Sequence, residues 1–128
     1  MKKWRKIAST VMAAMVMASV LSGCGSEKKA TGNDDTIKVG ASFELTGGLA
    51  NYGKSILSGL QLAATEVNAK GGINGKKLVV VESDNKSEPS ESGNAVTKLI
   101  TQDNVVAIVG PATTGCVAAS APISAANK

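Results

Sequence analysis

Residues 36 to 84 read TIKVGASFELTGGLANYGKSILSGLQLAATEVNAKGGINGKKLVVVESD, and the hydrophobic period of this stretch changes twice. Ile37 to Phe43 is a short apolar run that predicts a strand. From Ile56 to Val67 the apolar residues recur at helical spacing, which predicts a helix with one apolar stripe. Leu78 to Val81 is typical of a strand buried on both faces. The stretch therefore predicts a strand, a helix and a second strand.

Glycines and turn residues set the boundaries of these elements. Gly71 and Gly72 are expected to stop the helix, because glycine accepts the left-handed conformation at a helix C-terminus. Asn74-Gly75 predicts a tight turn before the second strand.

The same pattern continues after residue 84. Pro89 stands where a second helix can begin, and Asp103-Asn104 ends it. The apolar face of this helix consists of Ala95, Val96, Leu99 and Ile100. Val105 to Val109 predicts a third buried strand that stops at Gly110-Pro111. A last helix is expected near Thr114, and Pro122 is expected to break or kink it.

Alternation of strands and helices predicts an α/β fold, a three-layer parallel sheet with helices on both faces and right-handed crossovers. Ligands of such sheets bind outside the carboxyl ends of the strands. The loops at those ends are residues 44–51 and 110–115.

The N-terminus has the pattern of an export signal. Four basic residues within the first six precede an uncharged run from Ile7 to Val20, which is too short to span a bilayer comfortably. We expect residues 1–23 to be removed as a signal peptide. Leu21-Ser22-Gly23-Cys24 resembles the bacterial lipobox, so Cys24 is the predicted lipidation site and the membrane anchor on the extracytoplasmic face. The alternative is an ordinary signal peptide with an incidental cysteine.

The remaining chain is electrically balanced. Residues 24–35 contain no large apolar side chain and are expected to form a flexible tether. Ten basic and ten acidic residues lie beyond Cys24, and Phe43 and Tyr52 are the two aromatics there, so nothing predicts nucleic-acid binding. Cys116 has no partner once Cys24 is acylated, and without any histidine a catalytic cysteine is not favoured. We expect a small, half-buried thiol, with no metal and no cofactor.

One motif points to a different class of protein. Residues 48–55 fit G-x-x-x-x-G-K-[ST], the P-loop of nucleotide hydrolases, and lie between a strand and a helix. Nucleoside triphosphates are scarce outside the membrane, and Leu45 to Gly47 separate the motif from its strand. A hydrolase using Lys54 stays as the less favoured alternative, against a turn followed by a solvated lysine.

Three segments carry a family resemblance: IKVGASFELTGGLANYG, EVNAKGGINGKKLVVVESD and VAIVGPATTG. Together they resemble the N-terminal lobe of the branched-chain amino-acid binding proteins of ABC transporters, which have the type 1 periplasmic-binding fold. The resemblance covers residues 36–128. It implies a receptor, not an enzyme, that closes two lobes around an amino acid and presents it to a membrane permease. A sensory or regulatory lipoprotein with the same lobe is the alternative.

The resemblance also implies site residues: Tyr52, Ala112, Thr113 and Thr114. Tyr52 matches the tyrosine that forms a wall of the family's pocket, and Thr114 replaces the serine whose hydroxyl contacts the ligand carboxylate. A hydroxyl and free backbone N–H groups at a helix N-terminus suit a carboxylate on physical grounds as well. Thr113 or Thr114 could instead cap the helix. We expect the chain to be a fragment of the family architecture, lacking the second lobe.

Overall fold

The computed structural model describes residues 35–127. The predicted signal peptide, the predicted lipidation site Cys24 and all of the predicted tether except Asp35 lie outside the described residues. Between residues 35 and 127, no helix has both the length and the apolar character needed to cross a membrane.

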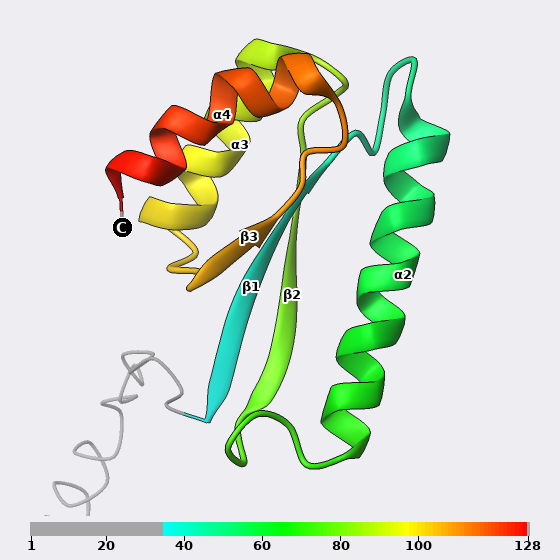
Figure 1. Cartoon of the computed structure of the whole chain (residues 1–128), viewed down its shortest axis with the longest axis vertical. Coiled ribbons are helices and arrows are strands. Elements are labelled where there is room, and N and C mark those ends of the chain that lie inside the picture. The colour runs from blue at the N-terminus through cyan, green and yellow to red at the C-terminus, as the bar shows by residue number, and fades with distance from the viewer. Residues whose placement is uncertain (1–34, 128) are drawn as a thin grey trace, which may run out of the picture. The chain divides into compact units, whose positions relative to one another are not determined.

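The described residues form a three-stranded sheet with helices on both faces (Figure 1). All strand pairs are parallel and the strand order is β2-β1-β3. Helix α2 lies against one face of the sheet, whereas α3 lies on the other face with α4 packed against it. The α/β three-layer prediction is therefore confirmed. The elements are β1 (Thr36–Phe43), α2 (Ala50–Ala69), β2 (Lys77–Asp84), α3 (Pro89–Thr101), β3 (Ala107–Val109) and α4 (Thr114–Ala126).

The register of the sheet brings three loops to one edge. β1 and β2 pair along their whole length, from Thr36 opposite Lys77 to Phe43 opposite Asp84. β3 pairs with β1 over three residues only and ends at Val109, opposite Ala41. Because the strands are parallel, the loops that lead into α2, α3 and α4 all leave from the carboxyl edge of the sheet.

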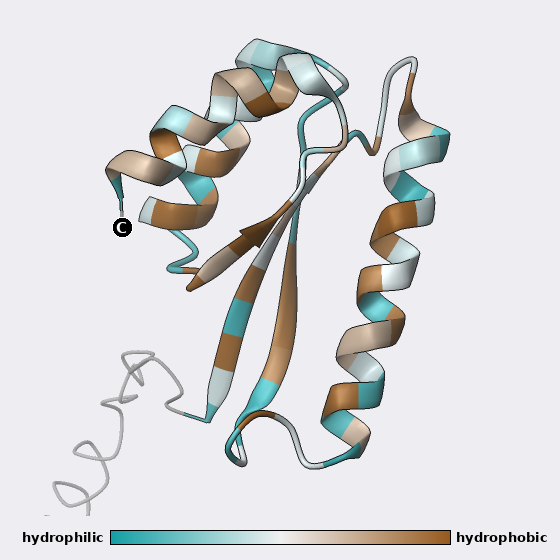
Figure 2. Cartoon of the chain, viewed as in Figure 1, coloured by the Kyte–Doolittle hydropathy of each residue, from teal (hydrophilic) through white to brown (hydrophobic). Residues whose placement is uncertain are grey.

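The core has a part on each face of the central strand. On the α2 side, Phe43 and Ala41 of β1 pack with Leu57. On the other side, α3 and α4 bury Leu99 and Cys116, and the Cys116 thiol is free. Figure 2 shows the hydrophobic residues gathered on the strands and recurring along the helices between hydrophilic ones. Cys116 is thus more deeply buried than the sequence predicts.

The boundaries predicted from glycines and turn residues are confirmed. α2 ends at Ala69, and Gly71 and Gly72 both have positive φ angles. Asn74 and Gly75 also have positive φ angles, in a turn closed by an antiparallel bridge between residues 73 and 76. This combination is the signature of a tight hairpin turn. α3 begins at Pro89, as predicted.

The prediction that the second and third strands are buried on both faces is wrong. Each lies at an edge of the three-stranded sheet described here. Val79 of β2 is 39% exposed, and Val106, just before β3, is 73% exposed. The strand predicted from Val105 to Val109 is also shorter, since only its last three residues form β3. A run of β-branched residues predicts a strand but not its position in the sheet.

Of the two outcomes expected at Pro122, a break or a kink, the break is wrong, because α4 continues through this residue to Ala126. A proline inside a helix costs about 3 kcal/mol of local stability. Packing of α4 on α3 opposes that cost: the Ser92 hydroxyl donates to the buried Cys116 carbonyl at 3.1 Å, and Gly93 allows close approach of Ile123. Tertiary packing here outweighs a local preference.

Candidate functional site

Three of the four predicted ligand-binding residues meet at the carboxyl edge of the sheet. Tyr52 lies in the first turn of α2, with 69% of its surface exposed. Ala112 and Thr113 lie in the loop that leads into α4. They border an open hollow of about 280 Å³, which we call the carboxyl-edge hollow. Its lining residues are Leu49, Tyr52, Ile56, Ala112 and Thr113.

The fourth residue, Thr114, lies beside the carboxyl-edge hollow and does not line it. Thr114 is the exposed first residue of α4, and Thr113 occupies the N-cap position. The Thr113 side chain makes no capping hydrogen bond to the helix. Thr113 is thus an N-cap by position only, and its hydroxyl has another partner.

That partner is Glu44, a fully buried carboxylate directly after β1. The Thr113 hydroxyl donates to Oε1 of Glu44 at 2.8 Å. The backbone N–H groups of Thr113 and Ala112 donate to Oε1 and Oε2, each at 3.2 Å. The donors that the sequence suggested for a ligand carboxylate at residues 112 and 113 are therefore already bound to a carboxylate of the protein.

These hydrogen bonds favour the ionised form of Glu44. Burial opposes the charge and by itself raises the pKa of Glu44, but the hydrogen bonds from Thr113, from the Glu44 backbone and from Ala112 outweigh it. The side chain of the buried Asn85 makes a further, smaller contribution. The pKa of Glu44 consequently lies below its ordinary value of 4.5.

The backbone of Glu44 also determines how closely α2 approaches. Gly53, in the first turn of α2, is buried against it, and a β-carbon at this position would clash with the carbonyl group of Glu44. Glycine at residue 53 therefore permits a contact that no other residue allows. Glu44 thus contacts α2 through its main chain and the α4 loop through its side chain.

A second carboxylate, Asp84, joins the other two loops at this edge. It accepts hydrogen bonds from the N–H groups of Leu45 at 3.0 Å and Lys86 at 2.8 Å. The N–H and the hydroxyl of Thr46 also donate to it, at 3.2 and 2.6 Å. Burial opposes ionisation here too, but these hydrogen bonds outweigh it and lower the pKa of Asp84.

The roles of both carboxylates were not predicted from the sequence. The available signal was their position, since each acidic residue lies at the end of an apolar strand, where loop amides need acceptors. Glu44 and Thr113 are 69 residues apart in the chain, so their pairing could not be read from spacing.

The segment that resembles a P-loop does not have the required geometry. α2 already begins at Ala50, four residues before the exposed Lys54. The N–H groups of Tyr52 and Gly53 donate to the carbonyl of Leu49 within the first turn. Since a P-loop cradles phosphates with free loop amides ahead of its helix, this segment cannot act as one.

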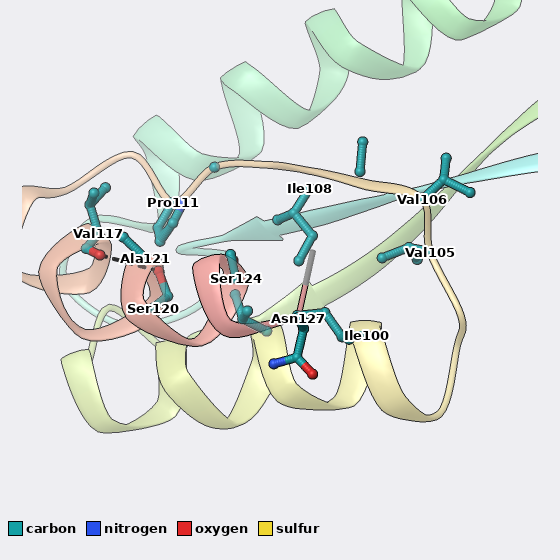
Figure 3. A pocket seen from close by; sticks show the side chains of 13 residues that line it. Ile100, Val105, Val106, Ile108, Pro111, Val117, Ser120, Ala121, Ser124 and Asn127 are labelled. Atoms are coloured by element: carbon teal, nitrogen blue, oxygen red, sulfur yellow. Dashed lines mark hydrogen bonds between the residues drawn. The ribbon is translucent and has the colours of Figure 1, made fainter.

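A larger groove lies between β3 and the helices α3 and α4, with a volume of about 390 Å³ (Figure 3). Its walls are largely apolar, and they include none of the predicted ligand-binding residues. We call it the β3 groove. Within residues 35–127, no group of three or more His, Cys, Asp or Glu side chains is placed to hold a metal ion.

Comparison with known proteins supplies the family. The family model of the periplasmic binding proteins matches residues 36–128. The Leu/Ile/Val-binding protein BraC3 of Rhizobium johnstonii is 39% identical over 79 residues, which cover 62% of this chain and 21% of the relative. The chain therefore spans about a fifth of the length of this curated relative.

Solved structures agree with the family match. The chain is similar to the branched-chain amino acid transporter substrate binding protein LivJ from Streptococcus pneumoniae, solved in complex with isoleucine, with a TM-score of 0.70 and 49% identity. The match covers 72% of this chain and 26% of LivJ. A fatty acid ABC transporter substrate-binding protein from Thermomonospora curvata matches with a TM-score of 0.66 and 32% identity, over 74% of this chain and 24% of that one. The chain therefore belongs to the periplasmic binding protein family, and its described residues have part of the type 1 periplasmic-binding fold.

Proposed function

We propose that this chain is part of an extracytoplasmic receptor that binds an amino acid and presents it to the permease of an ABC importer. The observation that carries the proposal is the meeting of Tyr52, Ala112 and Thr113 around the carboxyl-edge hollow. Solutes of parallel α/β folds bind at this edge of the sheet, and the family consists of solute-binding proteins.

A branched-chain aliphatic amino acid is the proposed solute. The hollow offers apolar surface from Leu49, Tyr52 and Ile56, which suits an aliphatic side chain. LivJ was solved with isoleucine, and BraC3 is named for leucine, isoleucine and valine. The fatty-acid relative makes a longer aliphatic acid the competing solute class.

The solute carboxylate is proposed to bind at the start of α4. Glu44 already takes the N–H groups of Ala112 and Thr113. The N–H groups of Thr114 and Gly115 lie in the first turn, where no intrahelical acceptor exists. These two groups and the exposed Thr114 hydroxyl form the remaining anion site, and the helix dipole favours a negative charge there.

Binding requires more surface than the described residues provide, because the carboxyl-edge hollow is open and the chain spans about a quarter of the length of LivJ. The test is a chimera in which this chain replaces the matching part of LivJ. Isothermal titration calorimetry should detect isoleucine binding, and Thr114→Val should weaken it by about 1–3 kcal/mol, since a buried solute oxygen loses its donor.

The matched control is Thr97→Val. Thr97 is an exposed threonine on α3, a helix that contributes no residue to the carboxyl-edge hollow, and its hydroxyl donates to the Gly93 carbonyl of the same helix. This substitution should leave isoleucine affinity unchanged. Equal affinity of the parent and Thr114→Val would remove Thr114 from the site. A chimera that binds a fatty acid and no amino acid would replace the proposed solute class.

Lipid anchoring through Cys24 is the second part of the proposal, supported by the lipobox at residues 21–24. Metabolic labelling with a radiolabelled fatty acid in a bacterial host should mark the parent and the Cys116→Ala variant, because Cys116 is buried in the fold. Cys24→Ala should carry no label. A labelled Cys24→Ala variant, or an unlabelled parent, would contradict the anchor.

A further inference from the structure

Glu44 contacts both sides of the carboxyl-edge hollow, although it does not line it. Its backbone packs against Gly53, the residue that follows Tyr52 in α2. Its carboxylate holds Ala112 and Thr113 on the opposite side, through three hydrogen bonds. Both walls of the hollow therefore contact one residue, which directly follows the central strand.

The polar contacts of Glu44 reach only the wall formed by Ala112 and Thr113, whereas its contact with α2 is the close packing of its backbone against Gly53. Within residues 35–127, no hydrogen bond or ion pair joins α2 directly to α4 or to the loop before it. The groups that stabilise the Glu44 carboxylate are uncharged: the backbone amides of Ala112 and Thr113, the Thr113 hydroxyl and, to a smaller extent, the Asn85 side chain. A charge-assisted hydrogen bond is roughly twice as strong as a neutral one, so these contacts are strong enough to hold a loop in one place.

Glu44 also determines which donors are left for a solute. A loop at a helix N-terminus normally presents all of its free N–H groups to an incoming anion. Here the Glu44 carboxylate accepts hydrogen bonds from the amides of Ala112 and Thr113 and from the Thr113 hydroxyl. The free donors begin one residue later, at Thr114.

We propose that Glu44 is the positioning residue of the carboxyl-edge hollow. Its ionised carboxylate places Ala112 and Thr113 opposite Tyr52 and shifts the anion site to Thr114 and Gly115. The inference rests on the proposed function only where it names the hollow a solute site. The placement of the two walls is a property of the chain without any solute, and it is tested in that state.

The first test is a pH titration of the ¹⁵N-labelled full chain by NMR. The amide signals of Ala112 and Thr113 should shift together as the pH falls, with one inflection below the ordinary glutamate value of 4.5. Glu44→Gln should abolish this inflection and speed hydrogen exchange of the Thr113 amide by roughly tenfold. Asp84→Asn is the matched control, because Asp84 binds other loops, and it should keep the inflection.

The second test measures the placement of the walls. Spin labels at the exposed positions 54 on α2 and 118 on α4, with both native cysteines replaced by alanine, report the distance between the helices by pulsed electron paramagnetic resonance. Glu44→Gln should broaden a narrow distance distribution. Glu82→Gln is the control, because the Glu82 carboxylate accepts a hydrogen bond from Gln61 of α2 and, among the described residues, has none to α4. This substitution should leave the distance distribution narrow.

The titration of the wild-type chain does not depend on whether a variant folds. It therefore tests by itself whether the amides of Ala112 and Thr113 respond to protonation of a carboxylate. Amides of Ala112 and Thr113 that do not respond to acid, or that respond equally in Glu44→Gln, would overturn the proposal. A distance distribution that stays narrow in a folded Glu44→Gln would do the same. Failure of the chimera to bind an amino acid would leave these solute-free results unchanged and would count against the proposed function alone.

Discussion

At the residue scale, the carboxyl edge of the sheet depends on two acidic side chains that accept hydrogen bonds from loop amides. Loops without regular structure leave N–H groups that need acceptors, and buried ones without a partner cost free energy. Glu44 accepts hydrogen bonds from backbone N–H groups of the loop before α4, and Asp84 accepts them from the loops after β1 and β2. The loops of the candidate site are therefore held by two carboxylates that do not line the carboxyl-edge hollow.

Gly53 is the residue at which a single methyl group should matter most. Gly53→Ala forces α2 away from Glu44, because the added β-carbon meets the Glu44 carbonyl. We expect a loss of about 1–3 kcal/mol in the free energy of unfolding, the usual cost of overpacking. Urea denaturation followed by circular dichroism measures it.

The control for Gly53 lies six residues further along the same helix. Gly59 is exposed, and a β-carbon there meets nothing within 4 Å. Gly59→Ala should therefore stabilise the chain by about 0.5–1 kcal/mol through helix propensity alone. If both substitutions stabilise equally, the close approach of α2 to Glu44 does not exist in solution.

At the element scale, the same two carboxylates make the junctions between strands and helices sensitive to acid. The folded-state pKa values of Glu44 and Asp84 lie below their ordinary values of 4.5 and 3.8. A lowered carboxyl pKa contributes stability that is fully present above the unfolded-state pKa and is lost as the pH falls through the folded-state pKa. The free energy of unfolding should thus decrease from about pH 5 downward.

Urea denaturation at a series of pH values checks this dependence. The double variant Glu44→Gln, Asp84→Asn should be less stable than the parent at neutral pH and should lose less stability on acidification. The interpretation fails if the parent and the double variant lose stability with the same slope.

The predictions for single elements succeeded where the signal was local. The start of α3 at Pro89 and the turn at Asn74-Gly75 depend on backbone preferences of the residues themselves, and both were confirmed. Pro122 does not break α4, because the packing of α4 on α3 outweighs the local cost of a proline. The strand predicted from Val105 to Val109 is shorter and less buried than expected, because hydrophobicity does not reveal how many neighbouring strands a strand has.

At the scale of the whole molecule, the outer edge of β3 has no strand partner among the described residues. β3 pairs only with β1, and the adjoining Val106 is 73% exposed beside the β3 groove. An open strand edge next to apolar surface favours association with another chain. We expect the unlipidated chain to self-associate as its concentration rises, and Val106→Lys to reduce this.

Sedimentation velocity measures the association directly. Leu62→Lys is the control, since Leu62 is similarly exposed at 61% but lies on α2, outside the β3 groove. It should leave the association unchanged. Equal effects of the two lysines would indicate general hydrophobic association and not pairing at β3.

The candidate site was predictable only in part. Two loops at the carboxyl edge were predicted from the sequence, and so were Tyr52, Ala112 and Thr113, which the structure brings to one hollow. Their role in binding stays a prediction. Glu44 was not selected, because its partners lie 68 and 69 residues away and no local pattern marks them.

The sequence by itself determined the α/β class, the order of the elements and most of their boundaries, and it predicts a site at the carboxyl edge of the sheet. These properties follow from hydrophobic period, turn residues and the geometry of parallel strands, all of which act over a few residues. Tertiary structure alone decided that β2 and β3 lie at sheet edges and that α4 continues through Pro122. It also decided that Glu44 accepts the hydrogen bonds of the donors in the loop before α4. Each of these depends on contacts between residues far apart in the chain, and such contacts leave no trace in local sequence.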